Sequence, residues 1–343
     1  MPADPYGLGR VIRQAGVLPQ KAERLDPSMP LRSGEVLIDV ESLNIDAASF
    51  KQLRGEVGDA AEALAQRIQA IVSARGKMQN PVTGSGGMLM GRVREIAQDS
   101  PHATSLKVGD RIATLVSLSL TPLEIRRVRG IHLASDRVDV EGHAILFASG
   151  ICAKLPSDFP EELALALLDV CGAPAWVARL ARPRMRILVL GAGKSGALCL
   201  AQARRSMQGK GVLLAADVSE PALNALHSMG LVDVPIVADA TQALEVFERV
   251  HSATEGQGVD LVINCASVPS TEMAGILCVR DGGTLLLFSM ATQFAAAALG
   301  AEGVGKDVTM IVGNGFVPGH AELTLELMRG EPALRAYFEK RYL

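Results

Sequence analysis

Short apolar runs alternate with segments of helical character in the second half of the chain. The apolar runs have the length of strands and lie at 186–191, 211–217, 234–239, 259–265 and 283–289. The segments between them that are expected to be helical lie at 194–208, 220–229, 241–254 and 269–279. Strands that alternate with helices predict a parallel sheet with right-handed crossovers.

The first half of the chain, up to about residue 150, shows a different pattern, with strands expected between irregular loops. Residues 36–41 alternate in the manner of a half-buried strand, and a second apolar strand follows the turn at 109–110. Apolar residues at helical spacing predict a helix over 56–75. The pattern changes near Pro156, where helix-start signals begin. We therefore expect a β-rich domain followed by an α/β domain.

Composition narrows the class of protein. The length of 343 residues is that of about two domains, and the 48% hydrophobic and 21% charged residues are typical of a folded globular protein. The formal net charge is −3 and no basic block occurs, which argues against nucleic acid or a membrane surface as the main partner. The chain has five cysteines, at positions 152, 171, 199, 265 and 278. They form no CxxC pair, so the sequence favours the reducing cytoplasm.

One uncharged stretch, between Asp281 and Glu302, is long enough to be tested as a membrane span. Glycine, serine, threonine and glutamine interrupt it, so we expect a buried strand at 284–288, then a loop and an alanine-rich segment. The N-terminus has no apolar core of a signal peptide, which again favours the cytoplasm.

A glycine-rich loop follows the apolar run that ends at Leu190. It reads Gly191-Ala192-Gly193-Lys194-Ser195-Gly196 and opens a segment of helical character. In this GxGxxG pattern the first glycine permits a tight turn, the second allows a pyrophosphate close to the backbone, and the third allows helix and strand to pack. The helix N-terminus then stabilises the negative charge of the phosphates. The loop therefore predicts a dinucleotide-binding domain.

Asp217 ends the next predicted strand and lies where an acidic side chain accepts hydrogen bonds from the adenosine ribose. A carboxylate there repels a 2′-phosphate, which favours NAD and leaves NADP possible. Other expected cofactor contacts follow the later strands, because the carboxyl ends of parallel strands line the crevice. They are Cys265, Ala266, Ser267, Ser289 and Met290.

The order of a β-rich half and a dinucleotide-binding half resembles the medium-chain dehydrogenase/reductase superfamily. Within it, long strings at 39–50, 75–91, 107–123, 168–175 and 190–196 resemble the L-erythro-3,5-diaminohexanoate dehydrogenase family. The resemblance implies a GroES-like β-rich catalytic domain over 1–160 and a Rossmann doubly wound parallel-sheet domain over 161–317. It also implies that 318–343 packs back on the first domain. The implied reaction is oxidative deamination of 3,5-diaminohexanoate to 5-amino-3-oxohexanoate and ammonia, in lysine fermentation.

The sequence departs from the zinc-dependent relatives at their ligand positions. Asp46 stands for the first cysteine, Ser85 and Gly86 stand for a His-Glu pair, and Cys171 alone remains a metal-type ligand. A catalytic zinc needs three protein ligands and an open position. We therefore predict no catalytic metal.

Removal of hydride from a C–NH₂ carbon requires the neutral amine and then attack by water, so proton-transfer groups are needed. The candidates are Asp46, Lys77 and Asp169. Asp46 has the alternative of capping a turn, and Asp169 of a helix-end or buried hydrogen bond. Lys77 is expected to hold the substrate carboxylate or act as a base, or else to be a solvated helix-end lysine. Neutral hydrogen bonds to the substrate are expected from Ser49, Asn80, Thr83 and Ser85.

Two other functions remain open from the residues alone. A zinc-free quinone or enoyl reductase has the same two-domain plan but a more apolar pocket, and a non-catalytic dinucleotide sensor would need only the glycine-rich loop. The partner is expected to be a small diamino acid. A homodimer is also expected, joined through the strand within 284–298, provided that this strand is the edge of the sheet.

Overall fold

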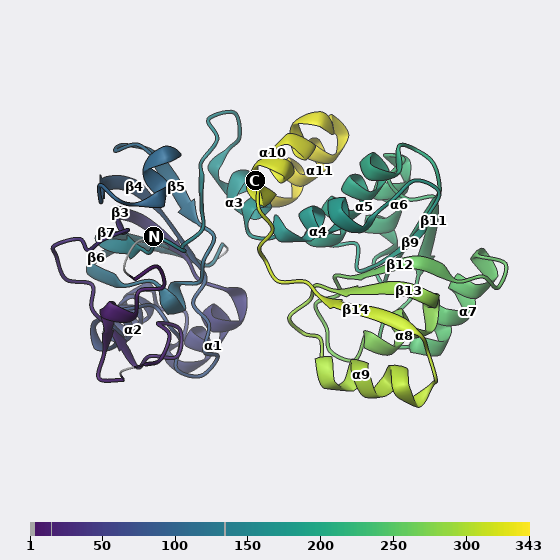
Figure 1. The fold of residues 1–343 in the computed structure, drawn as a ribbon, viewed down its shortest axis with the longest axis horizontal. Coiled ribbons are helices and arrows are strands. Elements are labelled where there is room, and N and C mark those ends of the chain that lie inside the picture. Colours follow the sequence, from purple (N-terminus) through teal and green to yellow (C-terminus); the bar gives the residue numbers. More distant parts are fainter. Residues whose placement is uncertain (1–3, 15, 134) are drawn as a thin grey trace. The chain divides into compact units, whose positions relative to one another are not determined.

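The computed structural model describes residues 4–14, 16–133 and 135–343, and its contacts divide the chain into two compact units (Figure 1). The units are Met1–Ser157 and Asp158–Leu343, so the division lies close to the expected one at residue 160. One unit has an antiparallel sheet and the other a parallel sheet with helices, which confirms the predicted fold class.

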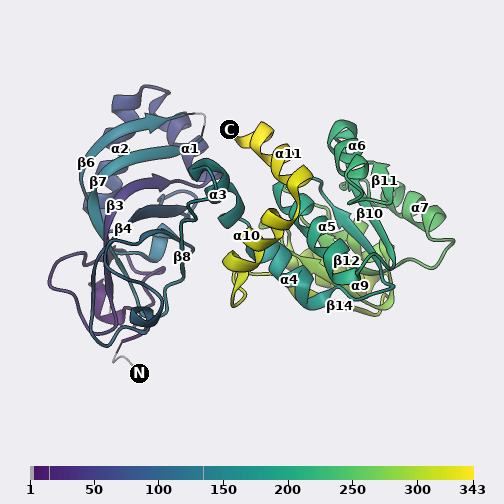
Figure 2. The ribbon, with the colours of Figure 1, turned by 90° about the horizontal axis from the view of Figure 1, so that it is seen from above.

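The first unit is built on a six-stranded antiparallel sheet in the order β6–β7–β3–β4–β5–β8 (Figure 2). The strands are β3 Val36–Asn44, β4 Met88–Ile96, β5 Arg111–Thr114, β6 Leu123–His132, β7 Arg137–Leu146 and β8 Cys152–Lys154. In the central strand β3, Val36, Ile38 and Val40 are buried, whereas Asp39 and Glu41 on the other face stay partly exposed, which confirms the expected half-buried strand. Leu37 is also buried, in a second apolar cluster with Ile145 and Phe147.

Two helices, rather than the single expected helix over 56–75, follow β3. They are α1, Ala47–Val57, and α2, Ala61–Arg75. Gly58, with φ +80°, ends α1 and separates the two. The buried face of α2 is the one that its periodicity predicts, and it packs on β6. The remaining short elements are β1 Val11–Ile12, β2 Arg24–Leu25 and the 3₁₀ helices η1 Leu8–Arg10, η2 Pro101–Thr104 and η3 Leu118–Leu120.

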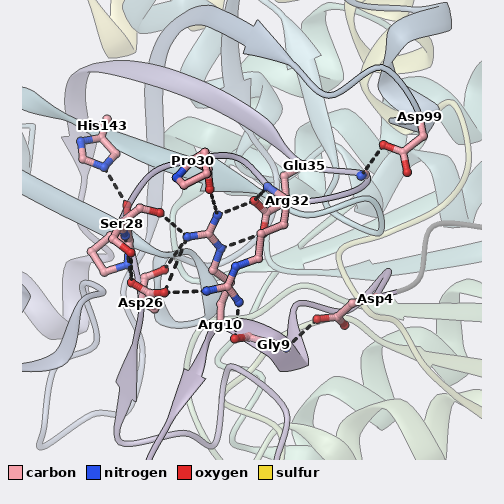
Figure 3. A network of polar contacts seen from close by, with 12 residues as sticks. Asp4, Gly9, Arg10, Asp26, Ser28, Pro30, Arg32, Glu35, Asp99 and His143 are labelled. Atoms are coloured by element: carbon pink, nitrogen blue, oxygen red, sulfur yellow. Dashed lines mark hydrogen bonds and ion pairs between the residues drawn. The ribbon is translucent and has the colours of Figure 1, made fainter.

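A buried ion pair anchors the segment before β3 to the first unit (Figure 3). Arg10 is 1% exposed, and its Nε and Nη2 donate to the two carboxylate oxygens of Glu35 at 2.8 and 2.6 Å. Nη1 and Nη2 also donate to the carbonyl oxygens of Asp26, Ser28 and Pro30. A buried charge pair is tolerated when its remaining donors have partners, which is the case here.

The second unit contains a six-stranded parallel sheet in the order β11–β10–β9–β12–β13–β14. The strands are β9 Arg186–Leu190, β10 Val212–Asp217, β11 Val234–Val237, β12 Val259–Asn264, β13 Val279–Leu287 and β14 Val308–Val312. The sequence predicts all of these except β14. Because β14 pairs with β13, the strand within 284–298 is not the edge of the sheet, and that part of the dimer argument is wrong.

Helices cover both faces of this sheet, with α5 and α6 on one side and α8 and α9 on the other (Figure 1). The helices are α3 Glu161–Leu168, α4 Gly172–Leu180, α5 Lys194–Met207, α6 Glu220–Ser228, α7 Ala243–Ala253, α8 Glu272–Cys278, α9 Phe294–Gly303, α10 His320–Gly330 and α11 Pro332–Tyr342. The last two contact α3, and α10 also contacts α4 and α5, all in the second unit. The expected packing of 318–343 on the first domain stays a prediction.

Within the described part of the chain, no single helix is both long and apolar enough to cross a membrane. The helices α3 and α4, which meet at a bend of 49°, pass that test of length and composition only as a pair.

Candidate active site

The glycine-rich loop connects the carboxyl end of β9 to the first turn of α5. Gly191 has φ +91°, and a Cβ there would lie 3.0 Å from the backbone nitrogen of Ala266. A Cβ on Gly196 would lie 1.8 Å from the carbonyl oxygen of Gly191, whereas one on Gly193 would meet nothing within 4 Å. The first and third glycines are therefore required by the fold, and the second leaves open space before the helix N-terminus.

The position of this loop in the sheet is the one at which open α/β sheets bind ligands. β9 lies between β10 and β12 in the sheet. The chain runs from β9 through β10 to β11 toward one edge, and from β12 through β13 to β14 toward the other edge, so the strand order reverses at β9. Ligands bind outside the carboxyl ends of the strands at such a switch point. Ala192, Lys194 and Ser195 lie in the same loop and first turn, as the motif predicts.

Asp217 ends β10 and fixes the glycine-rich loop directly. Its Oδ2 accepts a 2.6 Å hydrogen bond from the backbone N–H of Ala192, and its Oδ1 accepts one of 2.8 Å from the N–H of Ser219. A carboxylate has about four acceptor positions, so each oxygen retains one for a ribose hydroxyl. The sequence predicts the position of this carboxylate but not its bond to the loop.

The remaining expected cofactor contacts lie at the carboxyl ends of the next two strands. Cys265, Ala266 and Ser267 follow β12, and the N–H of Cys265 donates to the carbonyl oxygen of Leu190 at 2.8 Å. After β13, the N–H of Ser289 donates to the carbonyl oxygen of Asn264, and Met290 is exposed. These residues follow the carboxyl ends of β12 and β13, and their contact with a cofactor stays a prediction.

Asp169 forms an ion pair with a residue of the glycine-rich loop. Nζ of Lys194 lies 2.6 Å from its Oδ2. Asp169 ends α3, and its side chain is 46% exposed, so this carboxylate is not buried among the apolar residues around it in the sequence. The pair links α3 to the start of α5, and an ion pair this exposed contributes at most about 1 kcal/mol to stability.

Tyr342, in the last turn of α11, also approaches this loop. Nζ of Lys194 lies 6.0 Å from the centroid of the Tyr342 ring, within the range of a cation–π contact. Burial raises the pKa of the Tyr342 hydroxyl. Sequence reasoning missed this residue, because nothing local signals that the last helix turn packs beside the loop.

A second polar cluster lies in the first unit, where β3 leads into α1. Asp46 caps α1, and its Oδ1 accepts a 2.9 Å hydrogen bond from the N–H of Ser49. Its Oδ2 is buried and has no hydrogen-bond partner among the described residues. Asp46 thus caps the helix, as one interpretation predicts, and its role in the chemistry stays a prediction.

Three hydroxyl groups close a triangle beside this helix start. Oγ of Ser49 lies 2.6 Å from Oγ1 of Thr83 and 2.9 Å from Oγ of Ser85, and the last two are 3.0 Å apart. Asn80 is buried beneath them and accepts from the N–H groups of Val82 and Thr83. The structure therefore brings the expected neutral residues together, with Asn80 holding the loop.

The side chain of Lys77 contacts backbone carbonyl groups rather than the three hydroxyl groups. It is 0% exposed, and its Nζ donates to the carbonyl oxygens of Pro19 and Gln20 at 2.7 and 3.2 Å. Burial lowers the pKa of its amino group to about 8. The expectation of a solvated helix-end lysine is wrong, and its role in the chemistry stays a prediction.

Asp136 lies in a turn whose backbone contacts the residue before Asp46, and sequence reasoning missed it. The N–H of Ile45 donates to its carbonyl oxygen, which brings the turn before β7 against the end of β3. Burial raises the pKa of the Asp136 carboxyl, with Arg54 opposing this and the charge of Asp46 adding to it. An aspartate in a turn carries no local signal of such a pairing.

The comparisons with known proteins identify the family. Residues 9–156 match the model of the L-erythro-3,5-diaminohexanoate dehydrogenase N-terminal domain. The L-erythro-3,5-diaminohexanoate dehydrogenase of Acetoanaerobium sticklandii is 51% identical over 339 residues, and that of Fusobacterium nucleatum is 52% identical over 341 residues. Each alignment covers 98% of both chains.

The chain belongs to the L-erythro-3,5-diaminohexanoate dehydrogenase family. It is therefore an oxidoreductase, as the sequence predicts. Its fold is similar to that of an alcohol dehydrogenase from Thermotoga maritima, with a TM-score of 0.56 and 17% identity over 91% of this chain and 86% of the other. Membership of a dehydrogenase family, together with the loop at β9, supports a nicotinamide dinucleotide as the cofactor.

A zinc site requires that side chains able to bind zinc lie close together in the structure. Across residues 4–14, 16–133 and 135–343, no three His, Cys, Asp or Glu side chains come together as a metal site. Cys171, at the start of α4, is buried, and burial raises the pKa of its thiol to about 12. His102 and His143 are hydrogen-bonded to carbonyl oxygens, and His132 to a carboxylate.

Proposed function

We propose that this chain oxidises L-erythro-3,5-diaminohexanoate to 5-amino-3-oxohexanoate and ammonia, with NAD as the hydride acceptor and without zinc. The observation that carries the proposal is the identity of 51% and 52% to two dehydrogenases of that name over 98% of the chain. Because the match spans both units, it includes the glycine-rich loop and the polar cluster at Asp46 together. A place in lysine fermentation follows from this substrate.

The preference for NAD is supported by the charge at the end of β10. Asp217 is held by the N–H groups of Ala192 and Ser219, so its carboxylate stays beside the loop. A fixed negative charge there repels a 2′-phosphate and accepts hydrogen bonds from a free ribose diol. NADP remains usable at lower affinity, because the repulsion acts through a solvent-exposed site.

The reaction needs a neutral amine at C3 of the substrate. A bound nicotinamide would supply the hydride acceptor for C3. The carbon–nitrogen bond of the neutral amine then becomes an iminium, and one water adds and releases ammonium to leave the ketone. Residues of the chain must therefore take one proton from the substrate ammonium and activate one water.

Asp46 is the candidate for the first of these tasks. Its Oδ2 is buried without a partner among the described residues, and a side-chain rotation that exposes this oxygen would let it accept a hydrogen bond from a substrate ammonium group. The charge of Asp46 adds to the effect of burial in raising the pKa of the Asp136 carboxyl. The hydroxyls of Ser49, Thr83 and Ser85 supply neutral donors and acceptors in the same unit.

Asp169 and Lys77 differ in how readily their side chains could leave their present partners to contact the substrate. Asp169 is exposed enough to exchange its ion pair with Lys194 for a bond to substrate or water. Lys77 would have to leave the carbonyl oxygens of Pro19 and Gln20 before it could bind a carboxylate or act as a base. Its position favours a structural role.

A homodimer in the cytoplasm is part of the same proposal. The parallel sheet has edge strands β11 and β14, and we place the interface at β14, which pairs only with β13 among the described strands. An edge strand with unpaired backbone groups favours pairing with a second copy about a two-fold axis. Cys171, Cys199, Cys265 and Cys278 carry free thiols, which suits a reducing compartment.

The experiment is a balance of products. The purified chain is incubated with L-erythro-3,5-diaminohexanoate and NAD, and NADH, ammonia and the oxo acid are each quantified. We expect the three in equal amounts, with and without a chelator. NADH without ammonia would refute the deamination, and loss of activity on chelation would refute the zinc-free mechanism.

A further inference from the structure

Two cysteines from different elements of the second unit meet behind the glycine-rich loop. Cys199 lies in the second turn of α5 and is fully buried, whereas Cys265 directly follows β12 and is partly exposed. Their Sγ atoms are 3.8 Å apart, which is van der Waals contact between two free thiols. Neither thiol has a structural requirement that an alanine or serine would not meet.

The pair is placed to form a disulfide after a small movement. A disulfide has an S–S bond of about 2.05 Å, so the sulfur atoms must approach by about 1.8 Å. Cys265 lies where β12 passes into a loop, so the approach would displace a segment whose N–H donates to the carbonyl oxygen of Leu190. Burial raises the pKa of the Cys199 thiol well above its usual value, which keeps it protonated and leaves Cys265 as the thiol that meets solvent.

The same segment forms part of the wall of the proposed cofactor site. The N–H of Cys265 donates to the carbonyl oxygen of Leu190, and Ala266 lies against Gly191, the first glycine of the loop. A covalent bond from Cys265 to α5 would pull this segment toward the helix. It would thereby disturb the packing that sets the turn at Gly191.

We propose that Cys199 and Cys265 form a peroxide-sensitive dithiol, whose closure to a disulfide reversibly weakens dinucleotide binding. Hydrogen peroxide is the oxidant. Cys265 attacks its O–O bond and becomes a sulfenic acid with release of one water. The Cys199 sulfur then attacks the Cys265 sulfur, its proton leaves with the sulfenic hydroxyl as a second water, and the S–S bond forms.

The test uses the full chain, treated with hydrogen peroxide and then freed of it. Free thiols are counted, linked peptides are identified by mass spectrometry, and NADH affinity is measured by titration before and after a thiol reductant. We expect a loss of two thiols, a peptide linking 199 to 265, and NADH binding weakened by at least about fivefold and restored by the reductant.

Three variants separate this pair from general oxidation. Cys199→Ala and Cys265→Ser are each compared with themselves before and after peroxide, and we expect neither to show the reversible loss of NADH affinity. Cys278→Ala removes a different buried cysteine of the same unit and should respond as the wild type does. This control shows whether the effect belongs to the pair.

The cofactor readout rests on the proposed function, and the linked peptide does not. Absence of the 199–265 peptide, or its presence with unchanged NADH affinity, overturns the proposal. A wild-type response of Cys199→Ala also overturns it. If the reduced wild type binds no NADH, the cofactor assignment fails, and the linked peptide alone decides whether the dithiol exists.

Discussion

Replacement of Gly193 by valine separates cofactor binding from folding more cleanly than any other change in the glycine-rich loop. Gly193 has φ −73°, which any residue adopts, and a Cβ there meets nothing within 4 Å. The branched side chain would occupy the space where a pyrophosphate approaches the N-terminus of α5. We therefore expect Gly193→Val to fold and to lose dinucleotide affinity.

The size of the loss follows from the contacts that the side chain would block. A charge-assisted hydrogen bond from a backbone N–H to a phosphate contributes about 1.5–3 kcal/mol, and the helix dipole adds about 0.5–1 kcal/mol. Losing one such bond and the dipole interaction costs about 2–4 kcal/mol, which weakens binding by about 30- to 1000-fold. Valine is a poorer N-cap than glycine, so the free energy of unfolding should fall by no more than about 1 kcal/mol.

The assay is a fluorescence titration with NADH, beside urea unfolding of the same preparations. Gly196→Ala is the matched control, because its Cβ would lie 1.8 Å from the carbonyl oxygen of Gly191. That variant should lose stability and binding together. Unchanged NADH affinity in Gly193→Val, with the fold intact, would refute the placement of the pyrophosphate at this loop.

Three further predictions follow from the charged groups. Asp217→Ala should reduce the ratio of NAD to NADP affinity by removing the repulsion, although the loss of its bond to the Ala192 N–H weakens both; a wild type that already prefers NADP contradicts this interpretation. Asp46→Asn and Asp169→Asn should each lower kcat, which corresponds to a barrier higher by about 2–4 kcal/mol if the group transfers a proton. Deamination should become faster with rising pH, because the neutral amine is the reactive form. Normal kinetics in both variants would place the site elsewhere. The folded-state pKa of Lys77, about 8, lies below the ordinary lysine value of 10.5, so the unfolded chain binds more protons between these values. Stability should therefore rise with pH across that window by up to about 3 kcal/mol through this group, and Lys77→Met should abolish the rise in urea unfolding curves.

The alternation of strands and helices in the second unit could be predicted because it depends on patterns among residues that are close in sequence. Apolar runs and their spacing place β9, β10 and β12, and the glycine spacing places the loop between β9 and α5. Sequence reasoning missed β14 although Val308–Val312 contains four β-branched residues, so the local signal for a strand was present. The break between α1 and α2 was missed because the apolar spacing continues across Gly58.

The candidate site was only partly predictable, because its residues meet through contacts that are distant in sequence. The sequence offers Asp46, Ser49 and Ser85 only as separate candidates, whereas in the structure Oγ of Ser49 lies 2.9 Å from Oγ of Ser85. The burial of Lys77 depends on the segment at 19–20, which no local pattern connects to it. Tyr342 reaches Lys194 only because the last helix folds back within its own unit.

The most direct test of the central claim compares two reactions in one preparation of the enzyme. The first is NAD-dependent oxidation of L-erythro-3,5-diaminohexanoate, and the second is NADPH-dependent reduction of a conjugated ketone, each followed by the absorbance of the reduced nicotinamide. We predict a kcat/KM of about 10⁴ M⁻¹s⁻¹ or more for the diamino acid, with one ammonia released per NADH, and no measurable reduction of the ketone. No NADH from the diamino acid, or a larger kcat/KM for the ketone, would contradict the account.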